Sequence, residues 1–249
     1  MKVDRLSVVA LHIELYFNSQ YLGNGTGFTI RKKNSRYLVT NWHVVTGKHP
    51  VTKKSVLTSG MLPNKAVVWH HRKGKLGSWD EVEYELYLNK TPKWIQATAP
   101  NGDMVDVVLL AIDTLPYIDY HDLDLSLSES ELTVSPSEPV SIIGFPYGRS
   151  AALKFPIWKT GHIASDFDIN FDDKPIFLID TTTKPGMSGS PVFAKRVGSF
   201  QIDDAMIMGT AIKFMGIYSG RTSDDEIIDN SNLGLVWKPV VISILLREK

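Results

Sequence analysis

The segment KPGMSGSPVF, from Lys184 to Phe193, places a serine in a glycine-rich turn directly before an apolar run. Gly186 and Gly189 let the backbone bend tightly around Ser188, so that the N–H groups of Gly186 and Ser188 can point at one spot. A serine hydroxyl is a weak nucleophile unless a base takes its proton and donors meet the developing oxyanion. Taken alone, the segment fits a plain tight turn about as well as a nucleophile.

A base for Ser188 must be a histidine, because the chain contains no cysteine and nothing else supports a lysine base. All seven histidines precede Ser188, which excludes the α/β-hydrolase order, in which histidine follows serine. His43 follows the predicted strand RYLVT and lies in a predicted short turn, NWHVV, so its side chain is at a strand end that can face a cleft. A packed core histidine is the alternative interpretation of His43.

The other histidines have less telling surroundings. Four adjoin turns or polar segments and are expected at the surface: His49, His70, His71 and His121. Two lie within predicted strands and are expected to be packed: His12 and His162.

The acid that orients a catalytic histidine should be buried, where it can hold the imidazole tautomer and stabilise the imidazolium. Asp106 stands immediately before the apolar run VVLLAI, which is typical of a buried strand. A carboxylate there is costly unless it is paired. Asp103 and Asp113 compete for the role, but Asp103 is readily explained as a turn residue, and Asp106 is the better candidate.

Short alternating apolar runs separated by turn residues predict an all-β protein. We expect strands at 7–17, 27–31, 36–40, 67–71, 81–88, 105–112, 139–144, 157–163, 176–180, 191–194, 205–218 and 234–237. Helical periodicity is convincing only after Pro239, which suits a first helical position. We therefore expect an N-terminal β-domain at 1–118, a connector at 119–138, and a C-terminal β-domain with a terminal helix at 139–249.

Three ordered patches, LVTNWHVV, DVVLLAID and KPGMSGSPVF, resemble the His, Asp and Ser signatures of the chymotrypsin-like (trypsin-like) serine peptidases, especially the bacterial HtrA-type and glutamyl-endopeptidase branches. The segments GTGFTI, IGFPYG, KTGHIAS and MGIYSGR fall into register as well, so the resemblance spans roughly residues 25–237. It implies two six-stranded antiparallel β-barrels with the active site in the cleft between them. The expected activity is that of a serine endopeptidase.

By this resemblance, His43 is the general base, Asp106 its orienting partner and Ser188 the nucleophile. Gly186 and Ser188 supply the N–H groups of the oxyanion hole. The implied substrate-binding residues are Thr182 at the base of the first specificity pocket, its neighbour Thr183, and Tyr218, Ser219, Gly220 and Arg221 beside the substrate.

Three departures from the family pattern bear on specificity and control. Thr182 replaces the aspartate of trypsin, so cleavage after arginine or lysine is not expected. Tyr218 stands where glutamyl endopeptidases have histidine, and we expect a small or polar residue before the scissile bond, acidic if Arg221 reaches the pocket. Met187 replaces the aspartate that pairs with a newly cut N-terminus in zymogen-activated members, so activation by that salt bridge is not expected.

Composition limits the other functions. Lys+Arg and Asp+Glu are equal at 27 each, so the chain has no net field to attract nucleic acid or an anionic membrane. The apolar runs are too short to span a bilayer. We expect a cytoplasmic protein without metal or other cofactor that acts on a polypeptide. An unrestrained protease in the cytoplasm would endanger its host, so we expect a regulatory protein partner, a neighbouring effector or a narrow sequence requirement to control it. Stand-alone, cysteine-free peptidases that this chain resembles often accompany bacterial regulatory or anti-phage systems, and we expect such a setting here. The alternative is a catalytically silent peptide-binding module.

Overall fold

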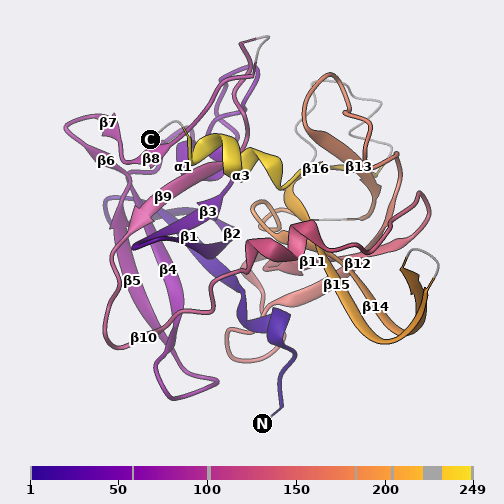
Figure 1. The fold of residues 1–249 in the computed structure, drawn as a ribbon. Helices are drawn as coiled ribbons and strands as arrows, with labels where there is room; N and C mark the ends of the chain where they lie inside the picture. Colours follow the sequence, from indigo (N-terminus) through magenta and orange to yellow (C-terminus); the bar gives the residue numbers. More distant parts are fainter. Residues whose placement is uncertain are drawn as a thin grey trace.

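The computed structural model describes residues 2–57, 59–99, 102–182, 184–202, 205–220 and 232–247, with no side chains described at 200–202, 205 and 207. Figure 1 shows two β-rich halves side by side, with the C-terminal helix lying across the region between them. Among these residues, no helix has the length and apolar character needed to cross a bilayer.

The first half is an antiparallel sheet of eight strands. Its strands run in the spatial order β10 (Ile118–Asp119), β4 (Lys65–Arg72), β1 (Ala10–Phe17), β2 (Gln20–Lys32), β3 (Ser35–Thr40), β9 (Val108–Ile112) and β8 (Trp94–Ile95), and β5 (Trp79–Glu85) pairs with β4. Strands β6 (Tyr87–Leu88) and β7 (Thr91–Pro92) form a separate hairpin. The sheet exceeds the six strands expected, because the two-residue strands β8 and β10 add to it.

The second half is a closed six-stranded barrel. Its strands close in the order β11 (Pro139–Gly144), β12 (Ile157–Ile163), β13 (Ile176–Asp180), β16 (Leu233–Trp237), β15 (Ala205–Gly220) and β14 (Pro191–Ile202). Strands β14 and β15 continue beyond the barrel as a two-stranded arm (Figure 1). Closure pairs every strand on both sides, so the barrel presents no open edge near the cleft.

Short helical segments flank the strands in the described part of the chain. They are the 3-10 helices η1 (Arg5–Val8), η2 (Leu125–Glu129) and η3 (Pro146–Gly148) and the α-helix α1 (Trp42–Thr46). The first predicted strand begins three residues late, because the Asp4 side chain accepts a hydrogen bond from Leu6 N–H and caps η1. The segment around His43, expected as a turn, is the helix α1. The predicted C-terminal helix is α3 (Val240–Leu245), with Pro239 as its N-cap.

One hydrophobic core joins the two halves. Phe28 of β2 packs edge-on against Phe214 of β15, with ring centroids 5.8 Å apart. Leu245 of α3 belongs to the same buried cluster as Leu109 of β9. Because burying a leucine side chain contributes about 1.5–3 kcal/mol, α3 ties the end of the second half to the first half. This shared core fixes how the two walls of the cleft face each other.

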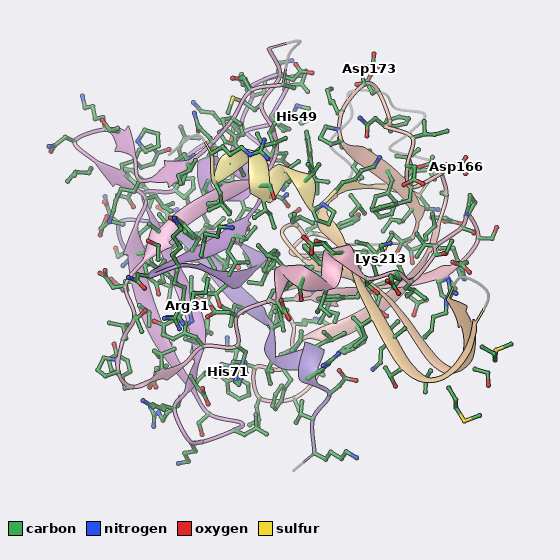
Figure 2. The ribbon with its side chains drawn as sticks, viewed as in Figure 1. Arg31, His49, His71, Asp166, Asp173 and Lys213 are labelled. Carbon is green, nitrogen blue, oxygen red and sulfur yellow. The ribbon has the colours of Figure 1, made fainter. Side chains whose placement is uncertain are left out.

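The structure corrects three of the histidine predictions. His70 and His71 lie in β4 and are buried, because their rings pack under aromatic side chains that include Tyr84 and Trp79. Figure 2 shows His71 well away from His49. His162 is exposed, because its side chain points outward from β12.

Candidate active site

His43 is held by one carboxylate at two points. It lies in the first turn of α1, directly after the end of β3. Its backbone N–H donates to Oδ1 of Asp106 at 2.8 Å, and its ring Nδ1 lies 2.7 Å from Oδ2 of the same residue. A carboxylate at Nδ1 favours the proton on that nitrogen and leaves Nε2 free to accept. The imidazole is therefore fixed in both position and tautomer.

Asp106 is a buried carboxylate with a full set of partners. Its exposed fraction is 1%, and it lies two residues before β9. Besides His43, the hydroxyl of Ser219 donates to its Oδ2, and the Asn41 side-chain amide donates to its backbone carbonyl at 2.6 Å. Ser219 comes from the second half, so this carboxylate links both walls of the cleft. The hydrogen bonds offset the cost of burying the charge.

Backbone geometry places Ser188. Gly186 and Gly189 have φ angles of +93° and +86°, in the left-handed region that L side chains rarely adopt. A Cβ on Gly189 would lie 1.9 Å from the carbonyl oxygen of Thr26, so only glycine fits there. The Ser188 carbonyl accepts a hydrogen bond from Thr26 N–H at 2.8 Å, and Gly189 N–H donates to the backbone carbonyl of Tyr218 at 2.9 Å. Both halves thus hold the turn.

Two N–H groups beside Ser188 are available to a ligand. Within the described ranges, neither Gly186 N–H nor Ser188 N–H donates a hydrogen bond to the protein. The carbonyl of Pro185 accepts from Tyr147 N–H at 2.6 Å. Because N–H and C=O point in opposite directions across a trans peptide, this bond directs Gly186 N–H away from Tyr147. Free N–H groups of this kind can stabilise an oxyanion.

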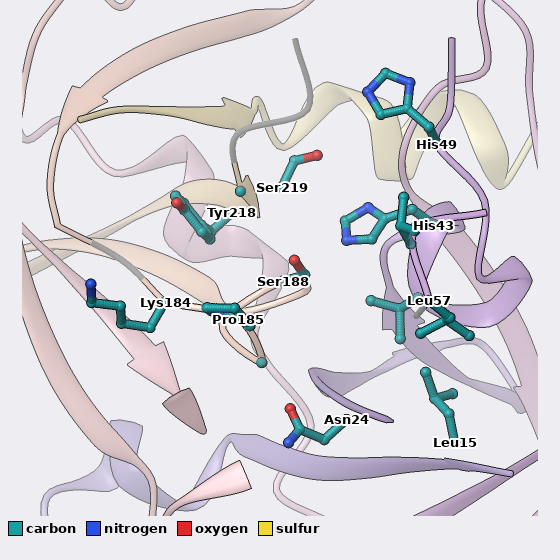
Figure 3. A pocket seen from close by; sticks show the side chains of 14 residues that line it. Leu15, Asn24, His43, His49, Leu57, Lys184, Pro185, Ser188, Tyr218 and Ser219 are labelled. Atoms are coloured by element: carbon teal, nitrogen blue, oxygen red, sulfur yellow. The ribbon is translucent and has the colours of Figure 1, made fainter. Parts of the chain in front are cut away.

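His43 and Ser188 lie next to each other in a cavity of about 430 Å³ between the two halves (Figure 3). From the first half, the cavity is lined by Leu15, Asn24, His43, Val44, His49, Val56 and Leu57, and from the second by Lys184, Pro185, Gly186, Ser188, Tyr218, Ser219 and Gly220. Most of the predicted site residues therefore meet around one space, with Asp106 directly behind His43.

The remaining predicted site residues lie elsewhere or cannot be placed. Thr182 is exposed and does not line this cavity. Thr183 and Arg221 lie outside the described residues.

Sequence reasoning missed Thr26 as a support of this site. Its buried hydroxyl donates to the Gly186 carbonyl at 2.8 Å and accepts from Phe145 N–H at 3.1 Å. It therefore connects β2 to the Ser188 turn and to the chain between β11 and η3. The GTGFTI motif marks this stretch in the sequence, but nothing local reveals that the threonine bonds to residues more than a hundred positions away.

Three buried histidines lie outside the cavity. Burial lowers the pKa of His12 to about 4, with a further contribution from the Lys154 charge. Burial also lowers the pKa of His71 to about 4, helped by His121, and that of His70 to about 3. These imidazoles are neutral near pH 7. Among the described side chains, no group of three or more His, Asp or Glu residues is arranged to hold a metal ion.

The sequence matches a family model described as a trypsin-like peptidase domain over residues 25–200. No curated protein matches it. The solved structures similar to it include a serine endoprotease from Yersinia pestis, with a TM-score of 0.53 and 14% identity over 100% of this chain and 67% of that one. They also include the inactive form of the Rv3671c protease, with a TM-score of 0.50 and 17% identity over 98% of this chain and 89% of that one. These likenesses confirm the predicted fold.

Proposed function

Because the chain belongs to the trypsin-like peptidase domain family, we propose that it is a serine endopeptidase with Ser188 as nucleophile, His43 as general base and Asp106 as orienting acid. The observation that carries this proposal is the pair of contacts from His43 to Asp106, at 2.7 and 2.8 Å, beside the N–H groups of Gly186 and Ser188, which bond to no acceptor in the part of the chain that the structure describes. A plain turn at Ser188 would not require this arrangement.

In the proposed reaction, Ser188 Oγ attacks the carbonyl carbon of the scissile peptide while its proton passes to Nε2 of His43. The oxyanion accepts hydrogen bonds from the N–H groups of Gly186 and Ser188. The C–N bond then breaks, and His43 gives its proton to the leaving nitrogen. Water attacks the resulting ester with His43 again as base, which releases the acid and returns the proton to Ser188.

Asp106 stabilises the imidazolium formed in both steps. It is buried and already bonded to His43, so little reorganisation is needed when the charge appears. The hydroxyl of Ser219 also holds the carboxylate in place.

For the residue before the scissile bond, we propose a small side chain. The Tyr218 side chain is 1% exposed and lines the cavity beside Ser188. A Cβ on Gly234 would lie 2.6 Å from Cε2 of Tyr218, so the ring packs against the β16 backbone. We infer that the ring limits the room for a bulky substrate side chain on this side of Ser188. A peptide library in which bulky apolar residues are preferred at this position would contradict this part of the proposal.

The test is labelling of the purified protein with a fluorophosphonate probe, followed by intact mass and peptide mapping. We expect one label per chain on Ser188, lost in Ser188→Ala and strongly reduced in His43→Ala. Folded protein that takes no label, either alone or in cell lysate, would indicate a silent peptide-binding module. Label only in lysate would indicate an enzyme that requires a partner.

A further inference from the structure

We propose that the first-half wall of the cavity is a subsite for a large apolar side chain immediately after the scissile bond, with the Asn24 carboxamide bonding the peptide group beyond it. We call Leu15, Val44 and Leu57 the leaving-side wall. The inference rests on the proposed endopeptidase function. The substrate class would be polypeptides with a large apolar residue immediately after the scissile bond, which becomes the new N-terminus on cleavage.

The chemistry identifies which wall faces the leaving group. The acyl part of the substrate is bonded to Ser188, whereas the leaving nitrogen must receive its proton from His43. The leaving nitrogen therefore lies on the His43 side of Ser188. Figure 3 shows Leu15 and Leu57 on that side, and Tyr218 and Lys184 across the cavity.

The leaving-side wall is apolar at the place where the first side chain after the scissile bond would lie. Val44 directly follows His43, and Leu57 lies close to the backbone of Gly23 and Gly47. Among the described lining residues, the one Lys, Arg, Asp or Glu side chain is Lys184, which belongs to the second half. Besides His43, the polar side chains among the described first-half lining residues are Asn24 and His49. A charged or strongly polar side chain against Leu15, Val44 and Leu57 would therefore lose hydration against an apolar surface.

Asn24 adds polar recognition below this apolar wall. It lines the cavity, and its carboxamide lies between the backbones of Gly148 and Gly186: a Cβ on either glycine would lie 2.6 Å from Nδ2 or 2.4 Å from Oδ1. Its one hydrogen bond among the described residues runs from Nδ2 to the Tyr21 hydroxyl and is long, at 3.4 Å. An acceptor and a donor therefore remain for a substrate peptide group.

The first experiment compares internally quenched peptides that differ only in the residue after the scissile bond: Leu, Phe, Ala, Ser or Asp. We expect kcat/KM for Leu or Phe to exceed that for Ser or Asp by about tenfold or more, the range that apolar pockets discriminate. In Leu57→Ser this ratio should fall towards one. The control Leu88→Ser, at a 65% exposed leucine of β6 outside the cavity, should keep it.

A second experiment measures the subsite through acyl transfer. An ester substrate forms the acyl-enzyme without any residue on the leaving side, and an added amine then competes with water. The amine nitrogen bonds to the acyl carbon, the Ser188 ester bond breaks, and the amine proton returns through His43 to Ser188. Leucinamide should capture the acyl group about tenfold better than glycinamide, and Leu57→Ser should remove this advantage.

Variants of Leu57 and Asn24 separate the apolar selection of the side chain from the hydrogen bond to the peptide group beyond it. Leu57→Phe narrows the subsite and should shift preference from Leu towards Ala, which a loss of folding could not mimic. Asn24→Ala should lower kcat/KM about two- to tenfold for peptides with two residues beyond the scissile bond, the size of one hydrogen bond, and leave the Leu over Ser ranking intact.

The outcomes distinguish this inference from the proposed function. Failure of fluorophosphonate labelling and ester hydrolysis, both in the purified native protein and in cell lysate, would overturn the endopeptidase and with it the subsite. Labelling with equal cleavage of all five peptides and equal capture of the two amides would overturn the subsite alone. Preference for Ser or Asp would do the same.

Discussion

The two walls of the cavity are built in different ways. On the second-half wall, Ser188 is placed by backbone: two glycines with positive φ and hydrogen bonds between main-chain groups. On the first-half wall, His43 is placed by one buried side chain, the carboxylate of Asp106. Steric changes in the turn should therefore displace Ser188, whereas loss of the single Asp106 charge should disable His43.

The largest effect is expected from Asp106→Asn. The amide preserves the shape but can present an N–H to His43 Nδ1, which favours the wrong tautomer and removes the charge that stabilises the imidazolium. We expect kcat to fall by about 10⁴-fold, as in triad enzymes generally, while the chain stays folded. Steady-state cleavage with circular dichroism as a folding check measures this.

Asp113→Asn is the matched control, because Asp113 is exposed directly after the strand that Asp106 precedes. It should retain activity within about twofold, since surface substitutions rarely exceed 0.5 kcal/mol. Equal activity of both variants would show that His43 does not depend on the Asp106 charge.

The backbone-built wall is tested by Gly189→Ala. The new Cβ would overlap the Thr26 carbonyl oxygen, 1.9 Å away, and the Thr40 hydroxyl, 2.5 Å away. We expect a loss of more than about 4 kcal/mol in the free energy of unfolding, in the range that marks exceptional substitutions. Urea unfolding measures it.

Gly102→Ala separates the steric cost from the cost of the backbone conformation. Gly102 has a φ of +87°, against +86° at Gly189, but a Cβ there meets nothing within 4 Å. Its substitution should cost only the left-handed strain, about 1–2 kcal/mol. Similar losses in both variants would contradict the proposed overlap.

The same contrast explains what could be predicted from the sequence. The tight turn around Ser188 could be predicted from its glycines, because backbone constraints are local. Three strands of the second barrel, β11, β12 and β13, also lie at the predicted residues. Helix α1 was missed because five residues are too few for a periodic pattern.

Features that depend on distant residues could not be read in advance. The burial of His70 and His71 depends on Tyr84, Trp79 and the connector residue His121, none of which adjoins them in sequence. The role of Thr26 likewise depends on Phe145 and Gly186, 119 and 160 positions away.

The buried histidines make stability depend on pH. His12 and His71 have folded pKa values near 4, below the unfolded value of about 6.5. The unfolded chain therefore binds more protons between these values, so stability is complete above about pH 6.5 and falls as pH drops towards 4. Each histidine contributes a slope of up to about 1.4 kcal/mol per pH unit. Urea unfolding measured from pH 7 to 4.5 checks this.

His71→Leu should reduce that slope by up to about 1.4 kcal/mol per pH unit, the contribution of one bound proton, because leucine cannot titrate. His162→Leu is the control, since His162 is exposed on β12. An unchanged slope in His71→Leu would mean that this imidazole does not stay neutral in the folded protein.

The smallest effect is expected where the two kinds of wall meet, at Thr26. Thr26→Val keeps the volume but leaves the Gly186 carbonyl and the Phe145 N–H without their buried partner. We expect a loss of about 1–3 kcal/mol in unfolding free energy. Because Gly186 supplies a proposed oxyanion donor, kcat should fall more than KM rises.

Thr26→Ser keeps the hydroxyl and should recover most of both losses, whereas Thr160→Val, at an exposed position of β12, should change neither. If Thr26→Val lost stability without changing kcat, the hydroxyl would support only the fold. A fall in kcat that serine rescues would instead show that a side chain from the His43 wall sets the backbone geometry of the Ser188 wall.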